Sequence, residues 1–227
     1  MAYPSTFRLK LYRDFKAIDA MDYHSVVRFY EQYEADITDL EEAPYFDCTL
    51  TYTLALFETG NYGQALVMCD HLLEWVIMHN VATWGGEDIY AKLLFKKAAA
   101  LYQLQEYPRC EYVLRELIKL HPFERFFERF LCTSLLRQKP RWHQRTRVAA
   151  MMLIFLAAGA VAVELFVVRP FFLDYYTRAL VVHNVLIGAG VLVLLTGELR
   201  HYWRCKKTAC DFANQMRARK TRRGNVS

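Results

Sequence analysis

The stretch VAAMMLIFLAAGAVAVELFVV, from Val148 to Val168, is almost entirely apolar, and its 21 residues carry a single charge, Glu164. A second run, ALVVHNVLIGAGVLVLLTG, covers 19 residues from Ala179 to Gly197 and has no formal charge. A helix needs about 20 apolar residues to cross the ~30 Å hydrocarbon core of a bilayer. Apolar runs of this length are rare in soluble domains. The sequence therefore predicts two transmembrane helices, 148–168 and 179–197.

The segment 169–178 that joins the two runs is short, and so brief a connection predicts an antiparallel hairpin with a small outside loop. Basic side chains are concentrated before the first run and after the second. By the positive-inside rule, both termini are expected in the cytoplasm. The N-terminal residues contain no apolar targeting segment, which favours the cytoplasmic (inner) membrane, and an organelle's outer membrane with the same cytosolic exposure stays open as an alternative. The flanking cations are expected to contact anionic lipid headgroups. They are Arg141, Arg145, Arg147, Arg200, Arg204, Lys206 and Lys207.

Three polar residues lie inside the predicted spans, near the outer end of the hairpin: Glu164, His183 and Asn184. Antiparallel packing would bring them to one level, where a hydrogen bond would reduce the cost of burying a carboxylate in lipid. Three interpretations stay open: a structural lock between the helices, a proton- or ion-responsive pair, and an unpaired Glu164. Small residues on possible contact faces of the hairpin are Ala158, Ala162 and Gly190.

The rest of the chain consists of an acidic N-terminal segment and two basic segments that flank the apolar runs. Residues 1–136 carry 13 basic and 20 acidic side chains, a net charge of −7, whereas the linker 137–147 carries +5. The tail, 198–227, holds nine basic residues from Arg200 onward. Its position after a predicted span favours lipid headgroups over nucleic acid as its partner. Docking of this tail on the chain's own acidic domain is a further possibility.

The acidic domain, 1–136, shows apolar residues at helical spacing and hardly any alternation typical of strands. Short breaks at Gly60, Gly85–Gly86, Pro108 and Pro122 separate the expected helices. An all-α fold of antiparallel helices follows. The expected helices cover residues 5–20, 22–38, 45–59, 62–79, 87–104, 107–120 and 122–137.

An internal repeat underlies these helices. The segment LFETGNYGQALVMCDHLL (56–73) aligns with LYQLQEYPRCEYVLRELI (101–118), and a third copy is expected to begin near Tyr23. In the two aligned copies a tyrosine begins the second helix and a small residue follows three positions later. The equivalent pairs are Tyr62 and Tyr107, Ala65 and Cys110, Cys69 and Leu114, and Leu72 and Leu117.

This pattern resembles the tetratricopeptide repeat (TPR) family, in which a small residue allows close packing of two helices and a proline ends the unit. The tyrosine spacing is longer than the family's 34 residues, and the first-helix Trp and Leu-Gly of the family are missing. The resemblance implies an α-solenoid that binds a partner protein in a groove lined by the first helix of each unit. Candidate groove residues are Tyr52, Lys92 and Lys96.

No motif for catalysis or cofactor binding stands out. The chain has no Gly-rich phosphate loop, no G-x-S-x-G and no H-E-x-x-H, and its six cysteines include no C-x-x-C pair. The sequence therefore predicts neither an enzyme nor a metal or cofactor site.

Two functional hypotheses follow. In the first, the chain is a membrane-anchored scaffold or adaptor whose cytoplasmic TPR-like domain holds a partner protein at the membrane. In the second, the hairpins associate into a homo-oligomer that forms a pore or a subunit of a transport or secretion complex. Two spans per chain cannot enclose a pore, so the second hypothesis requires oligomers.

Overall fold

The computed structural model describes residues 5–138, 141–163, 166 and 176–224. This part of the chain is all-α apart from one pair of two-residue strands. It divides into two compact units, which are taken separately below. The first unit joins Met1–Ser134 with Met216–Ser227, and the second is Leu135–Gln215.

The first unit begins with short helices. α2 begins after Asp22, whose side chain accepts a hydrogen bond of 3.1 Å from the backbone N–H of Ser25. The sequence predicts one helix over 22–38, but Tyr33 leaves the helical region with a φ of −116° and divides it in two. The three N-terminal helices are α1 (Ser5–Lys16), α2 (Tyr23–Gln32) and α3 (Glu34–Thr38).

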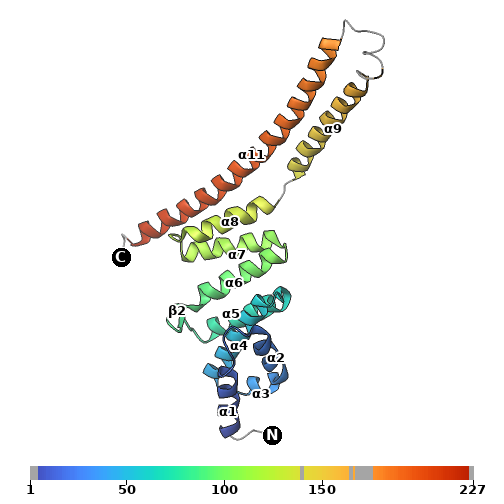
Figure 1. Ribbon diagram of the computed structural model, residues 1–227. Coiled ribbons are helices and arrows are strands. Elements are labelled where there is room, and N and C mark those ends of the chain that lie inside the picture. The colour runs from blue at the N-terminus through green and yellow to red at the C-terminus, as the bar shows by residue number, and fades with distance from the viewer. Residues whose placement is uncertain (1–4, 139–140, 164–165, 167–175, 225–227) are drawn as a thin grey trace. The chain divides into compact units, whose positions relative to one another are not determined.

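Five longer helices follow one another as antiparallel neighbours through the rest of the first unit (Figure 1), and the last of them ends three residues inside the second unit. Their positions agree closely with those expected from the sequence. α6 packs against both α5 and α7, while α4 packs against α2 and α5. They are α4 (Glu42–Glu58), α5 (Tyr62–Met78), α6 (Ile89–Gln103), α7 (Tyr107–Leu120) and α8 (Arg125–Arg137).

The turn after α4 and the turn after α6 have the same backbone geometry. Each contains one left-handed residue, Gly60 with φ 84° and Gln105 with φ 62°. The next N–H along the chain donates back to a carbonyl of the last helical turn, from Asn61 to Leu56 and from Glu106 to Leu101, each at 2.9 Å. Such a turn satisfies carbonyls that the helix end would otherwise leave unpaired. The ends of α4 and α6, which are equivalent in the sequence repeat, are therefore closed in the same way. The end of α5 is closed similarly, since Asn80 has a φ of 52° and the Val81 N–H donates to the carbonyl of Val76 at 3.1 Å.

The repeat positions quoted above are buried in this region, except the two tyrosines, which are half-buried. Ala65 and Cys110 are buried, and the Cys110 thiol donates to the carbonyl of Ala98 in the preceding helix at 3.2 Å. A larger side chain would hold the two helices apart, which explains the small residue at this position. The other repeat residues Cys69, Leu72, Leu114 and Leu117 are also buried.

A small strand pair between α5 and α6 was not expected from the sequence, which predicts only a turn there. β1 (Thr83–Trp84) pairs antiparallel with β2 (Glu87–Asp88). Gly85 and Gly86 join them with φ values of 60° and 83°, and two consecutive positive φ angles are the reason for two glycines in so tight a turn. Asp88 then caps α6 by accepting from Ala91 N–H at 3.0 Å.

The second unit contains α9 (Arg141–Val163) and most of α11 (Tyr176–Gly224). Part of the basic segment 137–147, predicted as a linker, is therefore helical. α11 continues without a break from the second apolar run into the basic tail. Within it, Asn184–Arg222 is long and apolar enough to cross a membrane, whereas the apolar part of α9, Val148–Ala162, is shorter.

α9 and α11 lie close together at Gly190. A Cβ atom placed on this glycine would lie 3.4 Å from Cγ1 of Ile154 and 3.6 Å from the carbonyl oxygen of Ala150. The small residue thus permits close approach of the two helices. On α9 the buried small residues are Ala150 and Ala157. Ala158 and Ala162, which the sequence suggested for a contact face, are exposed.

Candidate functional site

Tyr52, a predicted groove residue, lies inside the helical domain. Its ring stacks on that of Tyr30, with ring centroids 3.9 Å apart, and its hydroxyl donates to Glu31 at 3.4 Å. Burial, together with the nearby carboxylate of Glu31, raises the pKa of Tyr52 to about 12. The side chain therefore joins α2 to α4 in the core, and little of its surface can contact a partner.

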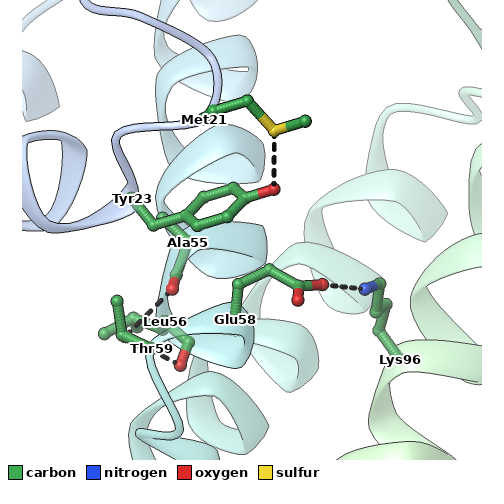
Figure 2. A network of polar contacts seen from close by, with 7 residues as sticks. All are labelled: Met21, Tyr23, Ala55, Leu56, Glu58, Thr59 and Lys96. Atoms are coloured by element: carbon green, nitrogen blue, oxygen red, sulfur yellow. Dashed lines mark hydrogen bonds and ion pairs between the residues drawn. The ribbon is translucent and has the colours of Figure 1, made fainter.

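Lys96 connects α6 to α4. Its ammonium group donates to Glu58 Oε1 at 2.9 Å and lies 4.3 Å from the ring centroid of Phe57. Figure 2 shows the Glu58 and Lys96 side chains pointing toward each other from these two helices. Both the ion pair and the cation–π contact hold the lysine in place.

Lys92, one turn earlier on α6, is paired as well. Its ammonium group donates to Glu87 Oε2 at 2.6 Å. This hydrogen bond and the lysine charge lower the pKa of the Glu87 carboxyl. Lys92 and Lys96 therefore lie on the same helix, but each already has a carboxylate partner within the chain. A bound acidic group would have to compete with that partner.

A groove lies between α5 and α7, with α6 as its floor. It encloses about 810 Å³, and we call it the α5–α7 groove. Leu94 of α6 is one of its buried floor residues, and Ile77 and Tyr112 stand at the rim with more than 60% of their surface exposed. Neither Lys92 nor Lys96 lines it. The groove is thus formed mainly by the second helix of each repeat, whereas the sequence predicts one lined by the first helices.

Charged side chains surround this apolar floor. Lys97 forms an ion pair with Asp70 across α6 and α5, and Arg109 pairs with Glu106 at 2.6 Å. Glu74 also lines the groove. An apolar floor with charges of both signs at its edges suits an amphipathic protein segment better than a small uncharged ligand.

A cluster of aromatic rings joins α6 to α8. Phe95 lies 5.4 Å from Phe126 and 6.1 Å from Phe130, measured between ring centroids, and Tyr102 lies 5.5 Å from Phe130. The sequence reasoning missed this cluster, although the aromatic spacing in FERFFERF (123–130) was a visible signal. Most of these rings are half-buried, so the cluster serves first to pack α8 onto the repeats.

The C-terminal end of α11 belongs to the first unit and is bound there by two cations. Arg217 donates from Nε to the carbonyl of Pro122 at 2.8 Å and from Nη2 to Glu128 Oε2 at 2.7 Å. Lys220 donates to the carbonyl of Leu120 at 2.8 Å. Positive charge at the C-terminal end of a helix, here α7, is favourable. The sequence suggests three partners for the basic tail: lipid headgroups, nucleic acid and the chain's own acidic domain. The C-terminal end of α11 contacts the last of these.

The predicted intramembrane polar residues are only partly described. Glu164 and the side chain of His183 lie outside the described residues, and Asn184 is exposed on α11. The side chains of Arg141, Arg145 and Arg147 are likewise outside the described part. The remaining headgroup candidates Arg200, Arg204, Lys206 and Lys207 are all exposed and lie together on α11.

No group of three or more His, Cys, Asp or Glu side chains within the described ranges is arranged to hold a metal ion. His201 and Cys205, one turn apart on α11, are buried, with the thiol sulfur 3.7 Å from Nδ1. His201 also lies 3.4 Å from the carbonyl of Leu136. These contacts are internal to the second unit.

Comparison with protein families, with curated proteins and with solved structures finds no match for this chain.

Proposed function

We propose that this chain is a membrane-anchored adaptor. Its helical domain is a TPR-like solenoid that binds a partner protein at the cytoplasmic face of the membrane, and the hairpin of residues 148–197 anchors it there with both termini inside. The α5–α7 groove carries this proposal because it combines a buried apolar floor with exposed apolar rim residues. Exposed side chains such as Ile77 and Tyr112 around a concave surface are typical of a binding site.

The repeat geometry supports the solenoid. The pairs α4–α5 and α6–α7 end their first helices with equivalent left-handed turns at Gly60 and Gln105. Their second helices bury a small residue at the equivalent position, Ala65 or Cys110. Stacked helical pairs of this kind present elongated surfaces suited to protein segments.

Site-specific photo-cross-linking tests the partner site. A photoreactive phenylalanine analogue replaces Tyr112 in the full-length chain, in cells. The control carries the analogue at Phe123, which is similarly exposed, at 65% against 67%, but does not line the groove. We expect one discrete adduct from position 112, abolished by Ile77→Glu, and none of that size from position 123. Equal adducts from both positions would contradict the assignment of the groove.

The oligomeric alternative makes a different prediction. If the hairpins assemble into a pore or a secretion subunit, the intact chain forms a discrete oligomer in mild detergent. The adaptor proposal expects instead a monomer, or a complex with a stoichiometric partner. Mass photometry of the purified full-length chain distinguishes these outcomes.

A further inference from the structure

A hollow of about 730 Å³ lies on α11, just beyond the apolar half of this helix. Its described lining comes from α11 itself, within the second unit. Leu199 and Trp203 provide the large apolar surfaces. The basic lining residues are Arg200, Arg204, Lys206 and Lys207. We call this hollow the Trp203 pocket.

The Trp203 pocket lies on the side of α11 that the described residues of the second unit leave open. Trp203 is 63% exposed and Leu199 is 62% exposed. By contrast, His201, Cys205 and Ala209 are buried and follow one another at intervals of four along the packed side of the same helix. Residues three and four apart share a helix face. The exposed pair Leu199 and Trp203 therefore lies on an open face of α11, and the buried residues lie on its packed face.

The chemistry of the open face is ordered along the helix axis. Apolar residues such as Leu192, Leu195 and Leu199 come first, all more than 60% exposed. Trp203 follows, and the cations lie around and beyond it, with Asp211 as the acidic residue in the lining. A matching ligand therefore has an apolar part toward Leu199 and an anionic part toward Lys207.

A phospholipid with an anionic headgroup has this order of groups. Tryptophan favours the boundary between hydrocarbon and water, and basic side chains near it attract anionic lipids. We infer that the Trp203 pocket binds one anionic phospholipid of the cytoplasmic leaflet, with the acyl chains along Leu199 and Trp203 and the headgroup at Arg200, Arg204 and Lys207. This inference rests on the proposed insertion of α11 into a membrane.

A quenching experiment on the full-length chain tests this site. The protein is reconstituted into phosphatidylcholine nanodiscs that contain either brominated phosphatidylglycerol or brominated phosphatidylcholine. The contribution of Trp203 is the difference in fluorescence between the wild type and Trp203→Phe. We expect brominated phosphatidylglycerol to quench this contribution at a lower lipid fraction than brominated phosphatidylcholine, and high salt to weaken the preference.

Two double variants, each of which removes two positive charges, test whether the preference for phosphatidylglycerol depends on the Trp203 pocket. Arg200→Gln with Lys207→Gln removes two cations from the pocket and is expected to reduce the preference about 30-fold. Arg219→Gln with Arg222→Gln removes two exposed cations outside the pocket lining and is expected to retain it. An equal loss in both variants would show general attraction by surface charge and overturn the site.

Further outcomes distinguish a failure of the proposed lipid site from a failure of the proposed membrane anchor. Equal quenching by the two brominated lipids overturns the lipid site while leaving the membrane anchor in place. Release of the chain from native membranes by alkaline carbonate overturns the anchor, and the lipid site with it. Retention after carbonate treatment, together with selective quenching, supports both.

Discussion

Gly60 and Gln105 occupy equivalent positions at the ends of α4 and α6, and both have left-handed backbone angles, with φ of 84° and 62°. Only the glycine is suited to this conformation, because a Cβ atom there approaches the following carbonyl oxygen. One copy of the repeat thus has the favourable residue and the other a strained one, although the two turns make the same hydrogen bonds.

Gln105→Gly is therefore expected to stabilise the helical domain by about 0.5–1 kcal/mol, the relief of strain being partly offset by the greater freedom of glycine in the unfolded chain. Amide hydrogen exchange of the α6 and α7 peptides in the full-length chain measures this change. The reciprocal control, Gly60→Gln, should destabilise α4 and α5 by about 1 kcal/mol. Open space surrounds Gly60, so this cost comes from the backbone angle alone. Faster exchange in Gln105→Gly would refute the argument.

The sequence predicts the helices well because their signals are local. Apolar spacing and the breaks at Gly60 and Pro108 are properties of short segments, and the structure confirms an all-α fold. The strands at Thr83–Trp84 and Glu87–Asp88 were missed because two residues are too short for any alternation. The extension of α11 into the tail was missed because the charge at Arg200 resembles the end of a membrane helix rather than its continuation.

The partners of surface side chains are harder to predict, because the sequence does not show which neighbouring helix each face of a helix meets. Lys96 and Lys97 are adjacent in the sequence, yet Lys96 pairs with Glu58 of α4 and Lys97 with Asp70 of α5. Only Lys97 lines the α5–α7 groove. Tyr52 suits a core and a groove equally by residue type, and its stacking on Tyr30 decides for the core.

Cys110 tests the close packing of α6 and α7. Its side chain is fully buried, with the sulfur 3.2 Å from the carbonyl oxygen of Ala98. We expect Cys110→Leu to destabilise the domain by about 1–3 kcal/mol through overpacking. Cys110→Ala keeps the close approach and should cost less. Hydrogen exchange of the α7 peptides compares the two variants, and equal or reversed effects would show that the small size of residue 110 is not what the fold requires.

Because the thiols of Cys48 and Cys69 are buried, we expect the helical domain to lose stability at alkaline pH. Burial, with the nearby carboxylates of Asp47 and Asp70, raises the pKa values of Cys48 and Cys69 to about 12, from an ordinary value of 9.0. Below pH 9 both the folded and unfolded chains keep these protons. Above pH 9 the thiols of the unfolded chain lose their protons before those of the folded chain. The contribution of these two thiols to the free energy of unfolding therefore declines as pH rises from 9 toward 12.

Thiol labelling of the native full-length chain checks the same environment. At mildly alkaline pH a maleimide should modify Cys210, which is partly exposed, well before Cys48 and Cys69. Peptide mapping by mass spectrometry identifies the labelled positions. Labelling of Cys48 at the rate of Cys210 would mean that its thiol is accessible in the folded chain, and the predicted alkaline dependence would lose its basis.

Arg217 is expected to hold the end of α11 on the helical domain. Its guanidinium group contacts the Pro122 carbonyl and Glu128, and both charged side chains are about three-quarters buried. Arg217→Ala removes both contacts and should weaken this attachment by about 1–3 kcal/mol. The exposed Arg219 provides the matched control, since Arg219→Ala removes the same charge two residues away. Hydrogen exchange of the peptide spanning Met216–Gly224 should accelerate in the first variant only, because α11 then frays from its end. If both variants accelerated exchange equally, the attachment would depend on the overall charge of the tail and not on the contacts of Arg217.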